Sequence, residues 1–173
     1  MKKKNKIGLG LAVLGLTVGY AAISTTLYIN GTATIKANSD DFKNKVIFTA
    51  ASATNGATAT ITNSGKTITF TTQEFTSIGD NTELTYTIGN TSNYDAKLGT
   101  PDVVCTADTG NETDYETYLT VGQGTALDGK TIERSGNGTD TLSVELKQSY
   151  VDDEVKTITF TCRINADAVE AGN

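Results

Sequence analysis

The stretch Thr82-Glu83-Leu84-Thr85-Tyr86-Thr87-Ile88 alternates between polar and apolar side chains. Leu84, Tyr86 and Ile88 are predicted to face a core, because successive side chains of a β-strand point to opposite faces. Similar patterns occupy residues 57–62, 66–71, 94–98, 103–105, 141–147 and 155–164, and a short apolar run covers residues 45–49. The chain is therefore predicted to be mainly β.

Turn residues separate these patterns, as Asn63-Ser64-Gly65 does between residues 57–62 and 66–71. That hairpin is predicted to bring Ala59 and Ile61 onto one face with Ile68 and Phe70. Roughly eight to ten short strands, each with one apolar face, predict a two-sheet antiparallel β-sandwich. Jelly-roll and immunoglobulin-like connections both fit the spacing, and a closed barrel is the structural alternative.

Residues 107–140 differ from the rest, because Gly and Asn interrupt them repeatedly. We expect a long loop excursion here. Residues 115–121 and 131–132 are its candidates for ordered structure.

The N-terminus combines a basic start, Met1-Lys2-Lys3-Lys4-Asn5-Lys6, with an apolar run over residues 7–23. This order predicts a secretory signal peptide, residues 1–21, with a helical apolar region and cleavage between Ala21 and Ala22. The alternative is a retained membrane anchor. Residues 22–173 are then predicted to form one domain.

Charge and composition exclude several classes of function. The chain has 14 basic and 20 acidic residues, and removing the four lysines of the signal leaves 10 against 20, a net charge of −10. Such a surface repels nucleic acid, and contact with a membrane is expected only through residues 1–23 if they are retained.

The absence of His excludes a Ser-His or Cys-His catalytic pair, so we expect neither an enzyme nor a cofactor. Asp40-Asp41 and Asp152-Asp153-Glu154 are interpreted as solvated turn charges instead of metal ligands, with calcium binding as the alternative.

A second alternation starts directly after the predicted cleavage site. Every second residue from position 23 onward then lies on the same face of the strand: Ile23, Thr25, Leu27, Ile29 and Gly31. Continued over residues 23–36, this strand would span about 46 Å, longer than a domain of this size pairs internally. One hypothesis is that its unpaired part lies in a groove of the next molecule and assembles a head-to-tail polymer. The alternative is a strand that bends at Gly31 and pairs within its own domain.

Two cysteines, Cys105 and Cys162, both fall on predicted inward faces. An exported chain with an even number of cysteines can bridge them. Two buried free thiols are the alternative.

Residues 19–24, with 27–33 after them, resemble the N-termini of the TasA and camelysin family of exported Firmicutes (Gram-positive) surface proteins. Residues 79–90, followed by 95–98, resemble a strand and turn element of that family. The resemblance implies a jelly-roll-like sandwich, cleavage by a dedicated signal peptidase, and assembly into biofilm-matrix fibres through the mature N-terminal strand. Camelysin-type proteins are also classed as metallopeptidases, but this chain lacks the histidines of a zinc site.

The sequence thus predicts a secreted structural subunit of a cell-surface or extracellular-matrix fibre. Its partners would be further copies of itself or related surface proteins. The alternative is a monomeric surface adhesin or binding module that uses the loops of residues 107–140.

Overall fold

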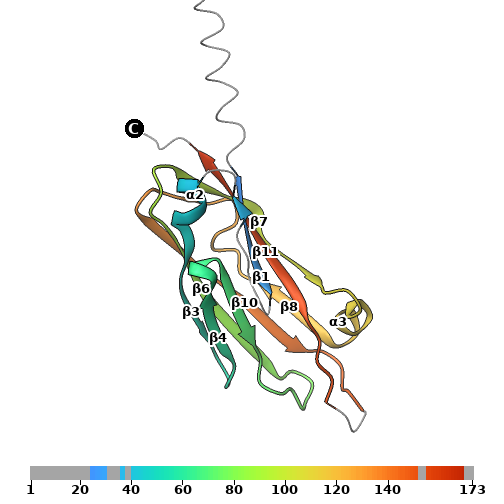
Figure 1. Cartoon of the computed structure of the whole chain (residues 1–173). Coiled ribbons are helices and arrows are strands. Elements are labelled where there is room, and N and C mark those ends of the chain that lie inside the picture. The colour runs from blue at the N-terminus through green and yellow to red at the C-terminus, as the bar shows by residue number, and fades with distance from the viewer. Residues whose placement is uncertain (1–23, 31–35, 38–39, 152–154, 170–173) are drawn as a thin grey trace, which may run out of the picture.

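The fold is a β-sandwich, seen in a computed structural model that describes residues 24–30, 36–37, 40–151 and 155–169 (Figure 1). In chain order the elements are β1 (Ser24–Asn30), β2 (Lys36–Ala37), α2 (Asp40–Lys45), β3 (Val46–Ala53), β4 (Thr58–Thr62), the 3-10 turn η1 (Asn63–Gly65), β5 (Thr67–Thr71), β6 (Asn81–Asn90), β7 (Asp95–Ala107), α3 (Glu112–Tyr118), β8 (Leu119–Gln123), β9 (Thr131–Ile132), β10 (Gly136–Leu146) and β11 (Phe160–Val169).

Two sheets pack face to face. The first has the order β4-β5-β1-β11-β7-β9, with β2 also paired to β1, and the second has the order β3-β6-β10-β8. The pairings are antiparallel, as predicted, except that β1 runs parallel to β5. The predicted two-sheet sandwich is therefore confirmed.

Alternation predicted the core-facing residues correctly. Leu84, Tyr86 and Ile88 of β6 are buried. The same parity predicts inward residues in segments 141–147 and 155–164, and these are buried: Leu142, Val144, Leu146, Phe160, Cys162 and Ile164. Ile158, also predicted to face inward, is only partly buried and precedes β11. On the core-facing side of the second sheet, the ring of Phe48 from β3 meets that of Tyr86 from β6 edge-on, with centroids 5.9 Å apart. The β4–β5 hairpin has the predicted register, because Ala59 lies opposite Phe70 and Ile61 lies opposite Ile68.

Two strand boundaries differ from the prediction. The segments on either side of Pro101 form one 13-residue strand, β7, which passes through a cis Thr100–Pro101 peptide bond. The strand predicted over residues 155–164 begins only at Phe160, because residues 155–159 have no strand partner among the described residues.

Residues 107–140 are more ordered than the predicted loop excursion. They contain α3, β8 and β9, and β10 already begins at Gly136. Glycine there permits close packing instead of breaking the strand: a Cβ on Gly138 would lie 2.6 Å from Cδ2 of the buried Leu127. The Gly- and Asn-rich composition therefore predicts a longer irregular loop than the structure contains.

The predicted 14-residue first strand is wrong. β1 ends at Asn30, and β2 then pairs antiparallel with β1, placing Lys36 opposite Thr26. A continuous extended strand over residues 23–36 could not bring these two residues together. The structure agrees instead with the alternative in which this part of the chain pairs within its own domain.

Candidate functional site

The first strand joins two parts of one sheet. All seven residues of β1, from Ser24 to Asn30, pair with β11, where they face residues 161–167. On its other side, residues 28–30 pair with β5 and Thr25 and Thr26 pair with β2. The β4–β5 hairpin is thus connected to the rest of its sheet through β1.

A groove continues the path of β1 beyond Asn30. Asn30 lies opposite Thr161 of β11 and Thr69 of β5, so the next positions along that path would face Phe160 and Phe70. These two residues and the segments beyond them, residues 71–76 and 155–159, line a groove of about 750 Å³. We call this hollow the strand groove.

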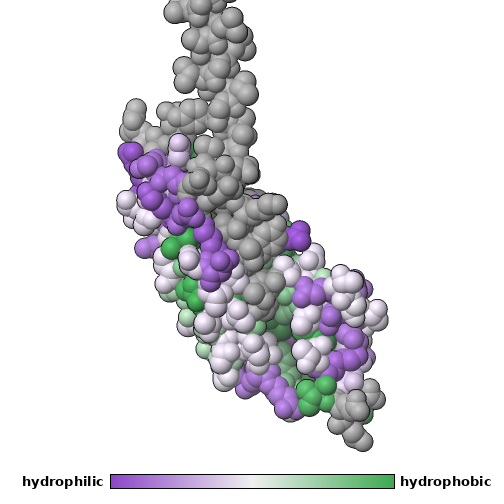
Figure 2. Space-filling view, viewed as in Figure 1, coloured by the Kyte–Doolittle hydropathy of each residue, from purple (hydrophilic) through white to green (hydrophobic). Residues whose placement is uncertain are grey.

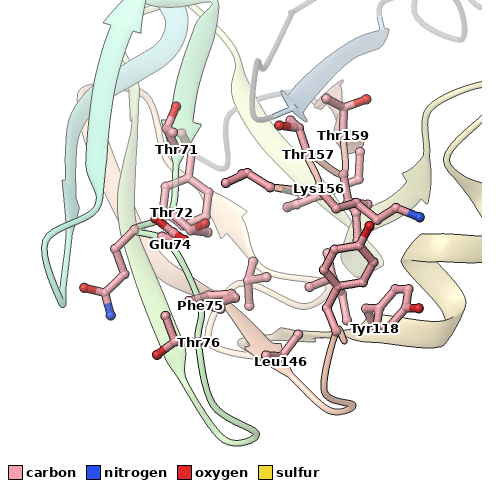
Figure 3. A pocket seen from close by; sticks show the side chains of 18 of the residues that line it. Thr71, Thr72, Glu74, Phe75, Thr76, Tyr118, Leu146, Lys156, Thr157 and Thr159 are labelled. Atoms are coloured by element: carbon pink, nitrogen blue, oxygen red, sulfur yellow. The ribbon is translucent and has the colours of Figure 1, made fainter. Parts of the chain in front are cut away.

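The floor of the strand groove is apolar. Phe70, Phe160, Leu146 and Val144 line it and are all buried. In the close-up, Thr71, Thr72 and Phe75 lie on one side and Lys156, Thr157 and Thr159 on the other, with Leu146 below (Figure 3). The space-filling view shows apolar surface within the lower half of this face, bordered by more hydrophilic residues (Figure 2).

The walls of the strand groove are two segments that belong to no strand. Residues 72–76 and 155–159 have no regular secondary structure, and neither segment has a strand partner within the described ranges. On its β7 side the second wall is anchored, since the backbone N–H of Asp108 donates to the Thr159 carbonyl at 3.0 Å. The Asn111 side chain accepts from the Thr159 N–H at 3.2 Å. The opposite side faces the groove, and can therefore accept a further strand.

Aromatic and charged residues form the rim next to α3. The Tyr118 and Tyr150 rings meet edge-on with centroids 5.5 Å apart. The Lys156 Nζ lies 5.7 and 5.4 Å from these two centroids and 2.7 Å from Oδ2 of Asp114. The hydrogen bond to Asp114 raises the pKa of Lys156, so this residue stays a cation at neutral pH.

The predicted assembly residues are only partly described. Ala21, Ala22, Ile23 and Gly31 lie outside the described residues, and so does the predicted signal peptide. The backbones of Thr25, Leu27 and Ile29 lie opposite Ala166, Ile164 and Cys162 of β11. The structure thus brings these three positions together beside the last strand of the chain.

Cys105 and Cys162 lie opposite each other in the register of β7 and β11 and form a disulfide bond. Cys162 is fully buried and belongs to the core, whereas Cys105 is partly exposed. A disulfide bond indicates an oxidising environment, as outside the cell.

The sequence prediction missed the strand groove itself. The sequence predicts residues 155–159 to be part of a paired strand, because Ile158 continues the parity of Phe160 and Cys162. Residues 71–76 carry no periodic pattern. Only knowledge of which strands are neighbours reveals that these two segments face each other.

Comparisons with protein-family models, with curated proteins and with solved structures found no match to this chain. None of the helices in the described part of the chain has the length and apolar character needed to cross a membrane. In the same ranges, no group of three or more His, Cys, Asp or Glu side chains is arranged to hold a metal ion.

Proposed function

We propose that this protein is a secreted, non-catalytic structural subunit of a cell-surface or extracellular-matrix fibre, assembled by exchange of its first strand. The observation that carries this proposal is that the strand groove continues the path of β1. The resemblance of residues 19–33 to the TasA and camelysin family supports it from the sequence side. The expected export signal and the disulfide bond fit a location outside the cell.

The length of the available path favours a donor strand longer than β1. β1 faces residues 161–167, and residues 155–160 border the groove beyond it. The alternating sequence over residues 23–36 is of similar length to residues 155–167. A strand from a second copy, fully extended along this path, would form several backbone hydrogen bonds that β1 does not form, each contributing about 1 kcal/mol.

Exchange of β1 conserves the pairing of the sheet. When β1 leaves its own domain, one edge of β5 and one edge of β11 lose their partner. The first strand of a neighbouring copy can restore both edges. The exchange therefore leaves the core of each subunit covered and links the subunits head to tail.

A disulfide lock tests this proposal. Thr26 and Asn165 are paired across β1 and β11, and Asn165 is exposed. The variant Thr26→Cys/Asn165→Cys is expected to hold β1 in its own domain, whereas Thr26→Cys alone cannot. All proteins are recovered from the medium of secreting cells and imaged by electron microscopy, with free thiols blocked.

We expect filaments from the wild type and from the single variant, and monomers from the locked variant. Filaments from locked protein whose disulfide lies within each copy, seen as single-chain bands in non-reducing electrophoresis, would refute strand exchange. Lasting monomers of the wild type at high protein concentration would refute the fibre itself.

A second candidate function is a monomeric binding module for a host or cell-wall glycan or peptide. The observation that favours it is the rim, where Tyr118 of α3, Tyr150 and Lys156 lie beside the strand groove. Aromatic rings next to polar side chains are typical of ligand sites. Wild-type protein that stays monomeric and loses ligand binding with Tyr118→Ala would support this function instead.

A further inference from the structure

A buried carboxyl group lies between the two sheets. Asp102 of β7 is only 1% exposed. Its Oδ2 accepts a hydrogen bond from the hydroxyl of Tyr86 in the opposite sheet, at 3.3 Å. Its Oδ1 is buried and has no hydrogen-bond partner among the described residues. An ionised carboxylate in this position would be poorly compensated.

Two further carboxylates hold a loop, residues 124–130, next to Asp102. Oδ1 of Asp128 accepts the backbone N–H of Asp102 at 2.8 Å. Oδ2 of Asp140, a buried residue of β10, accepts the backbone N–H of Leu127 at 2.9 Å. Leu127 itself is buried in the core. These contacts attach the loop to both sheets.

The groups that face Asp102 from all packed elements are acidic or neutral. They are Tyr86 from β6, Asp140 from β10 and Asp128 from the loop. Burial raises the pKa of Asp102 to about 7, assisted by the nearby carboxyl groups of Asp128 and Asp140. The Tyr86 hydroxyl acts in the opposite direction but does not prevent this rise. A protonated Asp102 can share its proton with Asp128, whereas an ionised one repels both carboxylates.

We propose that the protonation state of Asp102 controls how firmly residues 124–130, which include Leu127, are held. Protonated Asp102 keeps this loop in place, and ionised Asp102 loosens it. The direction of the effect follows from linkage. Because the closed structure raises the pKa of Asp102, its protonated carboxyl stabilises the closed loop fully below about pH 4, and this stabilisation is lost as the pH rises through about 7. If Asp102 has an ordinary pKa when the loop is open, the equilibrium constant for loop opening increases roughly ten- to one-hundredfold between pH 5 and pH 8.

The experiment measures amide hydrogen exchange of residues 124–130 between pH 5 and pH 8, corrected for the intrinsic exchange rate of an unfolded peptide. Asp102→Asn retains a polar side chain that cannot ionise, and is expected to remove the pH dependence. Asp95→Asn is the matched control: this buried carboxylate of the same strand accepts the Arg134 N–H and lies outside the cluster. The control is expected to retain the wild-type dependence.

A carboxyl ¹³C titration of Asp102 provides a second readout, with an expected midpoint near pH 7. If Asp102→Asn does not fold, Tyr86→Phe serves in its place, because losing the hydroxyl should raise this midpoint further. A midpoint near pH 4, corrected exchange that does not change with pH, or an equal pH dependence in Asp102→Asn would each overturn the proposal.

Discussion

Removing the disulfide bond gives the most quantitative test of how this sandwich is held together. The double variant Cys105→Ala/Cys162→Ala deletes the bond between β7 and β11. Alanine is preferred to serine because Cys162 is fully buried, and a hydroxyl there would add the cost of an unsatisfied polar group.

The expected loss follows from the length of chain that the bond closes. The two cysteines are 57 residues apart. For a loop of this length, the chain-entropy model predicts a loss of roughly 4 kcal/mol in the free energy of unfolding. A domain of this kind is stable by only about 5–15 kcal/mol, so the variant should remain folded with much of its stability gone.

Urea unfolding followed by circular dichroism measures this loss. With a slope of about 2 kcal/mol per molar urea, the midpoint should fall by about 2 M. Reduced wild-type protein is the control and should unfold close to the variant, because it lacks the same bond. Equal midpoints for the variant and the oxidised wild type would show that the bond does not constrain the unfolded chain.

Three further predictions each concern the substitution of one residue. Asn90→Ala removes a fully buried side chain that forms four hydrogen bonds with its neighbours, and should lower the free energy of unfolding by about 3 kcal/mol in urea titrations. Gly124→Ala places a Cβ 1.7 Å from Oδ1 of Asp140, so it should increase amide exchange of residues 124–130 at least tenfold, a change of about 1.4 kcal/mol. Asp80 accepts two backbone N–H groups that lower its pKa, so its stabilising effect is present above about pH 4 and lost in stronger acid. Its carboxyl ¹³C midpoint should lie below 3.8, and Asp80→Asn should unfold with a weaker acid dependence.

Strand periodicity predicted most of the fold, because burial of one face imposes a period of two on the sequence. Leu84, Tyr86 and Ile88 follow this rule without interruption. Where the prediction failed, backbone pairing decided the outcome. Ile158 continues the parity of Phe160, Cys162 and Ile164, yet residues 155–159 form no strand with a described neighbour.

The candidate sites were harder to predict, because each depends on contacts between distant parts of the chain. Asp102 is separated by 26 residues from Asp128 and by 16 from Tyr86, and nothing in the local sequence connects them. The strand groove arises because β1 stops at Asn30 while the segments on both sides continue. Neither feature has a local sequence signal.

The pairing of β1 with β11 also determines when this protein can fold. These are the first and last described strands of the chain, and they are neighbours in the middle of one sheet. During synthesis, that sheet cannot close until β11 has left the ribosome. Contacts of such wide sequence separation form slowly, so the newly made chain should remain unfolded for longer than one whose neighbouring strands are also neighbours in sequence.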